Sequence, residues 1–168
     1  MQSRVASAGQ QQVLARMGAR VRPRPLPEEL QALSRVMSRM ISIRHGRAGE
    51  YLACYLLEAY ADLEASGNLK IFTARDGSAL VGYFVVFVRN HIHYKDHLFA
   101  HNDILFLSEP YRKGFTGIKL IKFAEECLKV DGVSVLTINT KTHKPFDGVL
   151  QRLGFNHVEN IYSKLLRS

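Results

Sequence analysis

The stretch of residues 103–123 constrains the fold of this 168-residue chain more than any other. Residues 103–107 are mostly apolar and have the composition of a strand. A basic turn with Gly114 and Gly117 follows, and residues 117–129 then repeat apolar side chains at helical spacing. The pattern predicts a strand that runs through a glycine-containing turn directly into a helix.

Such a turn has the chemistry of a phosphate-binding site. The first N–H groups of a helix lack acceptors within the helix, and the helix dipole adds positive potential there. Gly114 and Gly117 allow close approach of an anion to the backbone, and Arg112 and Lys113 add positive charge. A Walker A sequence is absent, and the turn lacks the third glycine of the dinucleotide-binding fingerprint.

The remaining pattern predicts a sheet with both antiparallel and parallel pairs. Two helices are expected first, at residues 27–41 and 49–66. Asp76-Gly77 is then expected to join two strands in a hairpin, and strand–helix–strand steps follow. The expected later elements are strands 69–75, 79–89, 103–107, 133–140 and 158–166 and helices 117–129 and 145–153.

Positive charge is concentrated at the amino terminus of the chain. The formal net charge is +8, and residues 1–26 contain five arginines and no acidic residue. We expect a basic, flexible arm at 1–26 and a single domain at 27–168. Such an arm is suited to binding nucleic acid, and its composition also resembles a mitochondrial transit peptide.

The location expected for the protein is the cytoplasm. No apolar run approaches the length that spans a bilayer, and residues 1–12 lack the apolar core of a secretory signal. Cys54 and Cys127 form no CxxC pair and lie on apolar stripes of predicted helices. We expect both to be buried free thiols.

The turn resembles a motif of one enzyme family. Residues 108–117, SEPYRKGFTG, are similar to the pyrophosphate loop of the Gcn5-related N-acetyltransferases, Arg/Gln-x-x-Gly-x-Gly/Ala. Arg112 matches the first position and Gly117 the last, whereas Phe115 stands where the middle glycine is usual. The helix after the turn and Leu150–Phe155, LQRLGF, also fit, so the resemblance covers residues 68–168. The sequence of these residues looks most like that of small phage-encoded members of the family. Such an origin would place the protein in the host cytoplasm.

The resemblance implies an α+β fold with a central mixed, mostly antiparallel sheet flanked by helices. It also implies direct transfer of an acetyl group from acetyl-coenzyme A to a primary amine, and homodimers are common in the family. The implied cofactor-binding residues are Leu105, Phe106, Leu107, Arg112, Lys113, Gly114, Phe115, Thr116, Gly117, Asn139 and His143.

The family places its acid–base chemistry beside the central strand. Asp103 begins that strand, and His101 shares its face if the strand extends backward. Both are candidates for accepting the amine proton. The tyrosine that often protonates the leaving thiolate is replaced by Leu150, so the general acid stays open among Tyr94, Tyr111 and Tyr162.

A histidine-rich segment precedes the central strand. Residues 90–101 hold His91, His93, His97 and His101 without a recognised metal-ligand spacing. We predict no metal here and expect a loop that faces the substrate.

Two other classes of function stay open. Gly114–Gly117 matches the GxxG loop of RNA-binding KH domains, and the chain is basic. A catalytically inactive acetyltransferase fold with a structural or regulatory role is the other alternative. The amine acceptor has no motif in the sequence.

Overall fold

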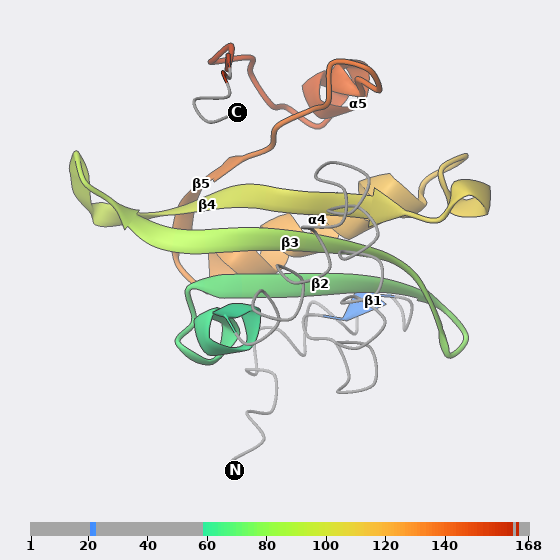
Figure 1. Ribbon diagram of the computed structural model, residues 1–168, viewed down its shortest axis with the longest axis horizontal. Coiled ribbons are helices and arrows are strands. Elements are labelled where there is room, and N and C mark those ends of the chain that lie inside the picture. Colours follow the sequence, from blue (N-terminus) through green and yellow to red (C-terminus); the bar gives the residue numbers. More distant parts are fainter. Residues whose placement is uncertain (1–20, 23–58, 163, 165–168) are drawn as a thin grey trace. The chain divides into compact units, whose positions relative to one another are not determined.

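A five-stranded sheet organises the chain, whose computed structural model describes residues 21–22, 59–162 and 164 (Figure 1). Its strand order is β1-β2-β3-β4-β5. Neighbours are antiparallel from β1 to β4, and β5 runs parallel to β4. The strands are β1 (Val21–Arg22), β2 (Leu69–Asp76), β3 (Ala79–His91), β4 (Tyr94–Leu107) and β5 (Val133–Thr137).

The β2–β3 hairpin confirms the clearest strand prediction. Asp76 pairs with Ala79, so the two loop residues are Gly77 and Ser78, one position later than Asp76-Gly77. Gly77 has φ +58°, a conformation that a hairpin loop needs and that costs glycine little.

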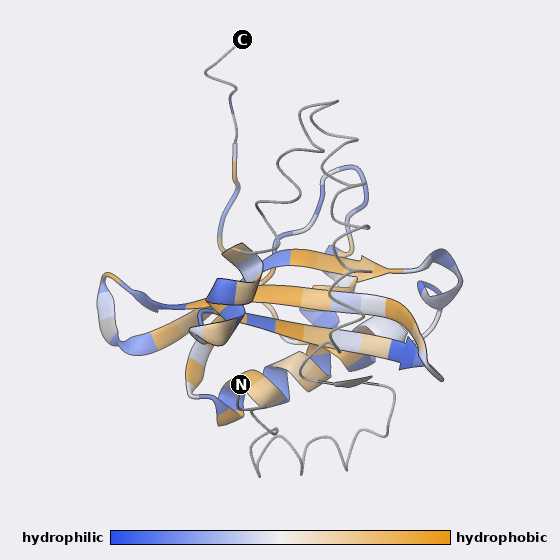
Figure 2. Cartoon of the chain, turned by 60° about the horizontal axis from the view of Figure 1, so that its bottom comes forward, coloured by the Kyte–Doolittle hydropathy of each residue, from blue (hydrophilic) through white to orange (hydrophobic). Residues whose placement is uncertain are grey.

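Helix α4 (Thr116–Val130) covers one face of the sheet and confirms the helix predicted at 117–129. Leu120, Phe123 and Cys127 are completely buried in a cluster with side chains of β2, β3 and β4. Burial raises the pKa of the Cys127 thiol to about 12, as expected for an inert free thiol. Figure 2 shows the hydrophobic colouring of the central strands that meet this helix.

The opposite face of the sheet carries a second apolar cluster. Tyr60 and Leu63, from helical residues 59–65, pack against Leu69, Tyr83 and Val85. Residues 59–65 confirm the end of the predicted second helix. The helix predicted at 27–41, residues 49–58 and Cys54 lie outside the described residues. In the predicted arm, Val21 pairs with Ala74 and Arg22 with Thr73.

The structure corrects the loop expected at residues 90–101. β3 continues to His91 and β4 begins at Tyr94, so only Ile92 and His93 form the connection. Backbone pairing of the two strands accommodates polar side chains because they remain exposed or half-buried.

The carboxyl-terminal elements are shorter than the sequence pattern predicts. β5 ends at Thr137, three residues early, and helix α5 (Asp147–Arg152) lies within the range predicted for a helix. Residues 158–162 belong to no strand, so the strand predicted at 158–166 is wrong there. Val158 and Ile161 are exposed, so these apolar side chains lie on no buried sheet face.

The chain divides into two compact units, Met1–Ile138 and Asn139–Ser168. α5 belongs to the second unit, and the five strands and α4 belong to the first. No helix among the described residues is long and apolar enough to cross a membrane.

Substitution of Gly82 tests how closely β3 and β4 approach each other. A Cβ at Gly82 would lie 2.4 Å from Leu107 Cδ2 and 2.8 Å from the Phe106 carbonyl oxygen. We expect Gly82→Ala to lower the free energy of unfolding by about 2 kcal/mol, because one of these atoms belongs to the backbone and yields little. Chemical denaturation measures the change.

Gly148→Ala is the matched control. Its Cβ would meet no atom within 4 Å, and Gly148 lies inside α5. The control should be neutral or stabilising by up to about 1 kcal/mol. Equal stability of the two variants would contradict the close approach.

Candidate functional site

A β-bulge in β4 lies at the centre of the site. Ile104 pairs with Val85 and Asn102 with Val86, so the intervening Asp103 has no partner residue on β3. A bulge places two consecutive side chains on nearly the same face and bends its strand. Asp103 and Ile104 accordingly both contact the cluster opposite α4.

Beyond the bulge, one edge of β4 is open. β5 pairs with β4 only from Leu98 to His101, so Asn102 and residues 104–107 pair with β3 alone within the described part of the chain. The Ser108 N–H donates to the Val81 carbonyl at 2.8 Å, on the β3 side. Backbone N–H and C=O groups alternate in direction along a strand. The backbone groups of Leu105 and Leu107 therefore point to the open edge.

The turn after β4 is held to the sheet by side chains. A 3-10 turn, η1 (Glu109–Tyr111), follows the strand, and the Tyr111 hydroxyl donates to Asp76 Oδ2 at 2.8 Å. Arg112 Nε donates to the Leu107 carbonyl at 2.8 Å. At Gly117 an added Cβ would lie 3.0 Å from Leu107 Cδ1, so a small residue lets α4 begin against the strand end.

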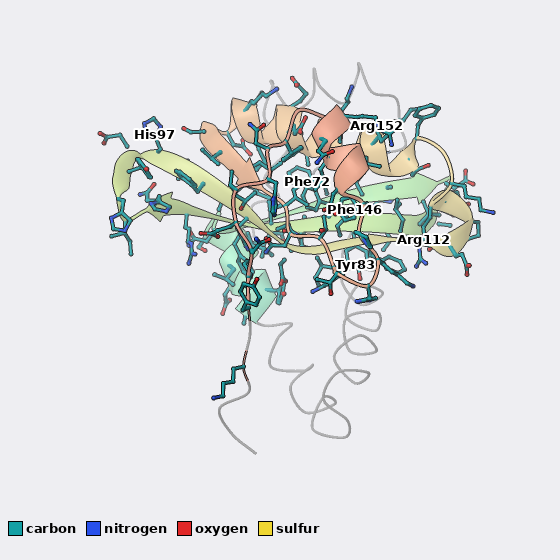
Figure 3. All side chains as sticks on the ribbon, turned by 90° about the horizontal axis from the view of Figure 1, so that it is seen from above. Phe72, Tyr83, His97, Arg112, Phe146 and Arg152 are labelled. Atoms are coloured by element: carbon teal, nitrogen blue, oxygen red, sulfur yellow. The ribbon has the colours of Figure 1, made fainter. Side chains whose placement is uncertain are left out.

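The amino terminus of α4 is open to an anion. No side chain caps it, and its first turn contains no acidic residue. Lys119 N–H is bonded to the Phe115 carbonyl, whereas the N–H groups of residues 116–118 have no acceptor within the helix. Gly114 turns the chain with φ +100°, and Arg112 and Lys113 are exposed beside it. Figure 3 labels Arg112 at this turn. These features suit phosphate binding.

Asp103 is bonded to a residue that the sequence pattern did not single out. The Tyr60 hydroxyl donates to Asp103 Oδ2. Burial, together with this hydrogen bond to the carboxylate, raises the pKa of Tyr60 above its ordinary value, so the hydroxyl keeps its proton. Tyr60 stands 43 positions from Asp103, and no motif connects them.

His101 lies at the point where β4 and β5 separate. Its Nδ1 is 2.7 Å from Thr137 Oγ1, and that hydroxyl donates to the Ala100 carbonyl at 3.3 Å. A hydroxyl has one proton, so when Thr137 donates to Ala100 it accepts from His101 Nδ1–H. In that arrangement the lone pair of neutral His101 is on Nε2, the atom that can act as a base.

The predicted cofactor residues fall into two groups. Leu105 to Leu107 and Arg112 to Gly117 follow one another along β4, the turn and the start of α4. Asn139 and His143 belong to the second unit. In that unit Thr140 Oγ1 donates to Asp147 Oδ1 at 2.7 Å.

The tyrosines considered as general acids differ in setting. Tyr111 is bonded to Asp76, and Tyr162 is 91% exposed. Tyr94 lies at the tip of the β3–β4 hairpin, where its ring stacks on Phe99 and lies near His91.

The histidine cluster forms ring contacts at this tip. The ring centroids of His91 and Phe99 are 4.6 Å apart, and His97 Nδ1 is 3.0 Å from Ser134 Oγ. Among the described residues, no three His, Cys, Asp or Glu side chains gather in a way that could hold a metal ion.

The interpretation of Gly114–Gly117 as the GxxG loop of a KH domain is wrong. The segment Gly114–Gly117 follows β4 and η1 and precedes α4. A KH domain needs this loop between two helices, and a strand stands in place of the first.

Solved structures share this fold. A GCN5-related N-acetyltransferase from Ralstonia eutropha JMP134 has a TM-score of 0.66 at 15% identity and matches over 86% of this chain and 98% of its own. Glucosamine-6-phosphate N-acetyltransferase from Arabidopsis thaliana has a TM-score of 0.66 at 10% identity, over 88% of this chain and 98% of its own. A transcriptional regulator from Bacillus halodurans C-125 has a TM-score of 0.67 at 17% identity, over 87% and 98%.

These likenesses show the fold and confirm the predicted class, a mixed, mostly antiparallel sheet flanked by helices. The fold is that of the Gcn5-related N-acetyltransferases. No protein-family model matches the sequence, and no curated protein matches it.

The tautomer of His101 can be measured. We expect Thr137→Val to remove the acceptor of the Nδ1 proton, so that neutral His101 shifts from the Nδ1–H form toward a mixture of tautomers. Nitrogen-15 chemical shifts of the ring report this change.

Ser134→Ala is the matched control, since it removes the equivalent hydroxyl from His97. It should leave the ring shifts of His101 unchanged. A wild-type His101 that is already Nε2–H would contradict the assignment.

Proposed function

We propose that the protein is an N-acetyltransferase that moves an acetyl group directly from acetyl-coenzyme A to a primary amine. The observation that carries the proposal is the open edge of β4, which leads straight into an uncapped, basic helix start. One end of this path suits an extended amide chain, and the other suits phosphates. Coenzyme A contains both groups in that order.

Each part of the path has a proposed role. The N–H groups at the start of α4, with Arg112 and Lys113, would bind the pyrophosphate. The backbone of Leu105 and the N–H of Leu107, whose carbonyl already accepts from Arg112, would pair with the amides of the pantetheine arm. One N–H at this edge would stabilise the negative charge that develops on the thioester oxygen.

The transfer itself needs a neutral amine. Asp103 and His101 are the proposed proton acceptors, directly or through water. The amine nitrogen forms a bond to the acetyl carbon while the carbon–sulfur bond breaks. The ammonium loses one proton to Asp103 or His101 before the attack, and the thiolate departs with the bonding electrons. The second proton leaves the nitrogen as the amide forms and passes to the thiolate or to water. A thiol has a pKa of roughly 8.5, so the departure does not demand a dedicated acid.

Titration calorimetry with acetyl-coenzyme A tests the proposal. We expect the wild-type protein to bind it and Arg112→Glu to weaken binding by at least about tenfold, because the reversed charge repels the phosphates. Arg112 also supports the turn, so Lys113→Glu is the second variant, with the same direction of change expected. Lys113 is exposed and makes no hydrogen bond or ion pair within the described residues.

Lys122→Glu is the matched control. Lys122 is exposed on the body of α4, so the same reversal there should change the Kd by less than about threefold. A folded wild-type protein that does not bind acetyl-coenzyme A would overturn the proposal. Binding without transfer to any amine would instead favour an inactive member of the fold.

A further inference from the structure

The turn end of the β3–β4 hairpin, residues 89–99, extends past the neighbouring strands. β2 pairs with β3 only as far as Phe87, and β5 pairs with β4 only from Leu98 onward. Among the described residues, 89–97 therefore have no strand beside them other than the two of the hairpin itself. Figure 1 shows the hairpin end projecting beyond β2, and Figure 3 labels His97 on it. It contains none of the residues proposed above for acetyl transfer.

Four rings meet at the hairpin end. The centroid of the His91 ring lies 4.6 Å from that of Phe99 and 5.1 Å from that of Tyr94. The His93 ring is 5.5 Å from His91, and the His93 N–H donates to His91 Nδ1 at 3.2 Å, which orients the central ring. The planes of Tyr94 and Phe99 are at 16°, with centroids 5.9 Å apart. At these separations aromatic rings interact favourably, so the four form one continuous cluster.

The ring cluster is open to solvent. Tyr94 is 57% exposed, and His93 is also exposed. Between the two strands, Ile92 is 94% exposed. Ring faces that are exposed to water are stabilised when a flat apolar partner covers them.

The charges near the rings favour an anionic partner. Arg89 pairs with Phe99, and residues directly opposite each other in an antiparallel pair share one face of the sheet. Arg89 is exposed, and its guanidinium makes no hydrogen bond or ion pair within the described residues. Residues 89–97 hold Arg89 and Lys95 against one acidic residue, Asp96, and the whole chain has a formal net charge of +8. Rings beside such a guanidinium match a polymer that alternates flat bases with phosphates.

We propose that the hairpin end binds single-stranded nucleic acid, with bases stacked on Tyr94 and His93 and a phosphate at Arg89. Stacking requires only a ring face, so binding should tolerate many base sequences. A double helix should bind more weakly, because its bases already stack on one another. This activity is independent of acetyl transfer.

Fluorescence anisotropy with two labelled strands of equal charge tests the inference. One strand is an oligothymidylate of about 12 nucleotides, and the other is the same backbone without bases. We expect the wild-type protein to bind the thymidylate strand at least about fivefold more tightly, because only this strand can stack. The five arginines of residues 1–26 attract both strands alike, so the ratio of the two affinities reports stacking.

Two substitutions of Tyr94 test the ring. Tyr94→Ala should weaken binding of the thymidylate strand roughly tenfold, as expected for one stacked base, and binding of the strand without bases by less than about twofold. Tyr94→Phe keeps the ring and should stay within about twofold of the wild type for both strands. Because the Tyr94 side chain is largely exposed, both variants should fold, and chemical denaturation checks that they do.

Arg89→Ala tests the phosphate contact. It should weaken binding of both strands by the same factor, since both contain phosphates. It should also lower the slope of log Kd against log salt concentration by about 0.7, the share of one phosphate on a single strand.

Tyr162→Ala is the matched control. Tyr162 is 91% exposed and belongs to the second unit, so its loss should change both affinities by less than about twofold. Equal affinity of the wild type for the two strands would overturn the inference, as would equal losses in Tyr94→Ala and Tyr162→Ala. Thymidylate binding that Tyr94→Ala leaves unchanged would also overturn it and favour a protein partner for the rings.

Discussion

The separation of β4 from β5 is the constraint on which the candidate site depends. Parallel pairing ends at His101 and Thr137, and the bulge at Asp103 follows within two residues. The bulge matters because an extra residue bends the strand and redirects side chains. The backbone groups of Leu105 and Leu107 on this edge therefore face no neighbouring strand among the described residues, and Arg112 donates to the Leu107 carbonyl. β3 supports the same strand on its other side without interruption from Ile104 to Leu107.

The turn beyond β4 depends on this support from the sheet. Arg112 joins the turn to the last strand carbonyl, and Tyr111 joins it to Asp76 at the end of β2. Gly82 lies against Leu107 Cδ2 and Gly117 against Leu107 Cδ1, and each leaves space that a Cβ would occupy. The position of the α4 amino terminus relative to the strand is therefore set by contacts from three elements. The anion-binding geometry is a property of this packing as much as of the loop sequence.

Sequence patterns were most informative where an element is well buried. The β-forming residues of β2 and β3, which are buried on both faces, and the helical stripe of α4 coincide with the two apolar clusters. Patterns were misleading where burial is partial. Residues 90–101 are polar yet form paired strands, because backbone hydrogen bonds do not require apolar side chains. Residues 158–162 contain apolar side chains yet form no strand, and Val158 and Ile161 there are exposed.

By itself the sequence determined the strands of the β2–β3 hairpin, helix α4, the fold class and the basic glycine turn, since β-forming runs, helical periodicity and the helix start are encoded by neighbouring residues. Only the tertiary structure decided the bulge and the partners of the candidate catalytic residues. Asp103 meets Tyr60 across 43 positions, and His101 meets Thr137 across 36. Strand register determines such contacts, and register emerges when distant segments pack around a common core.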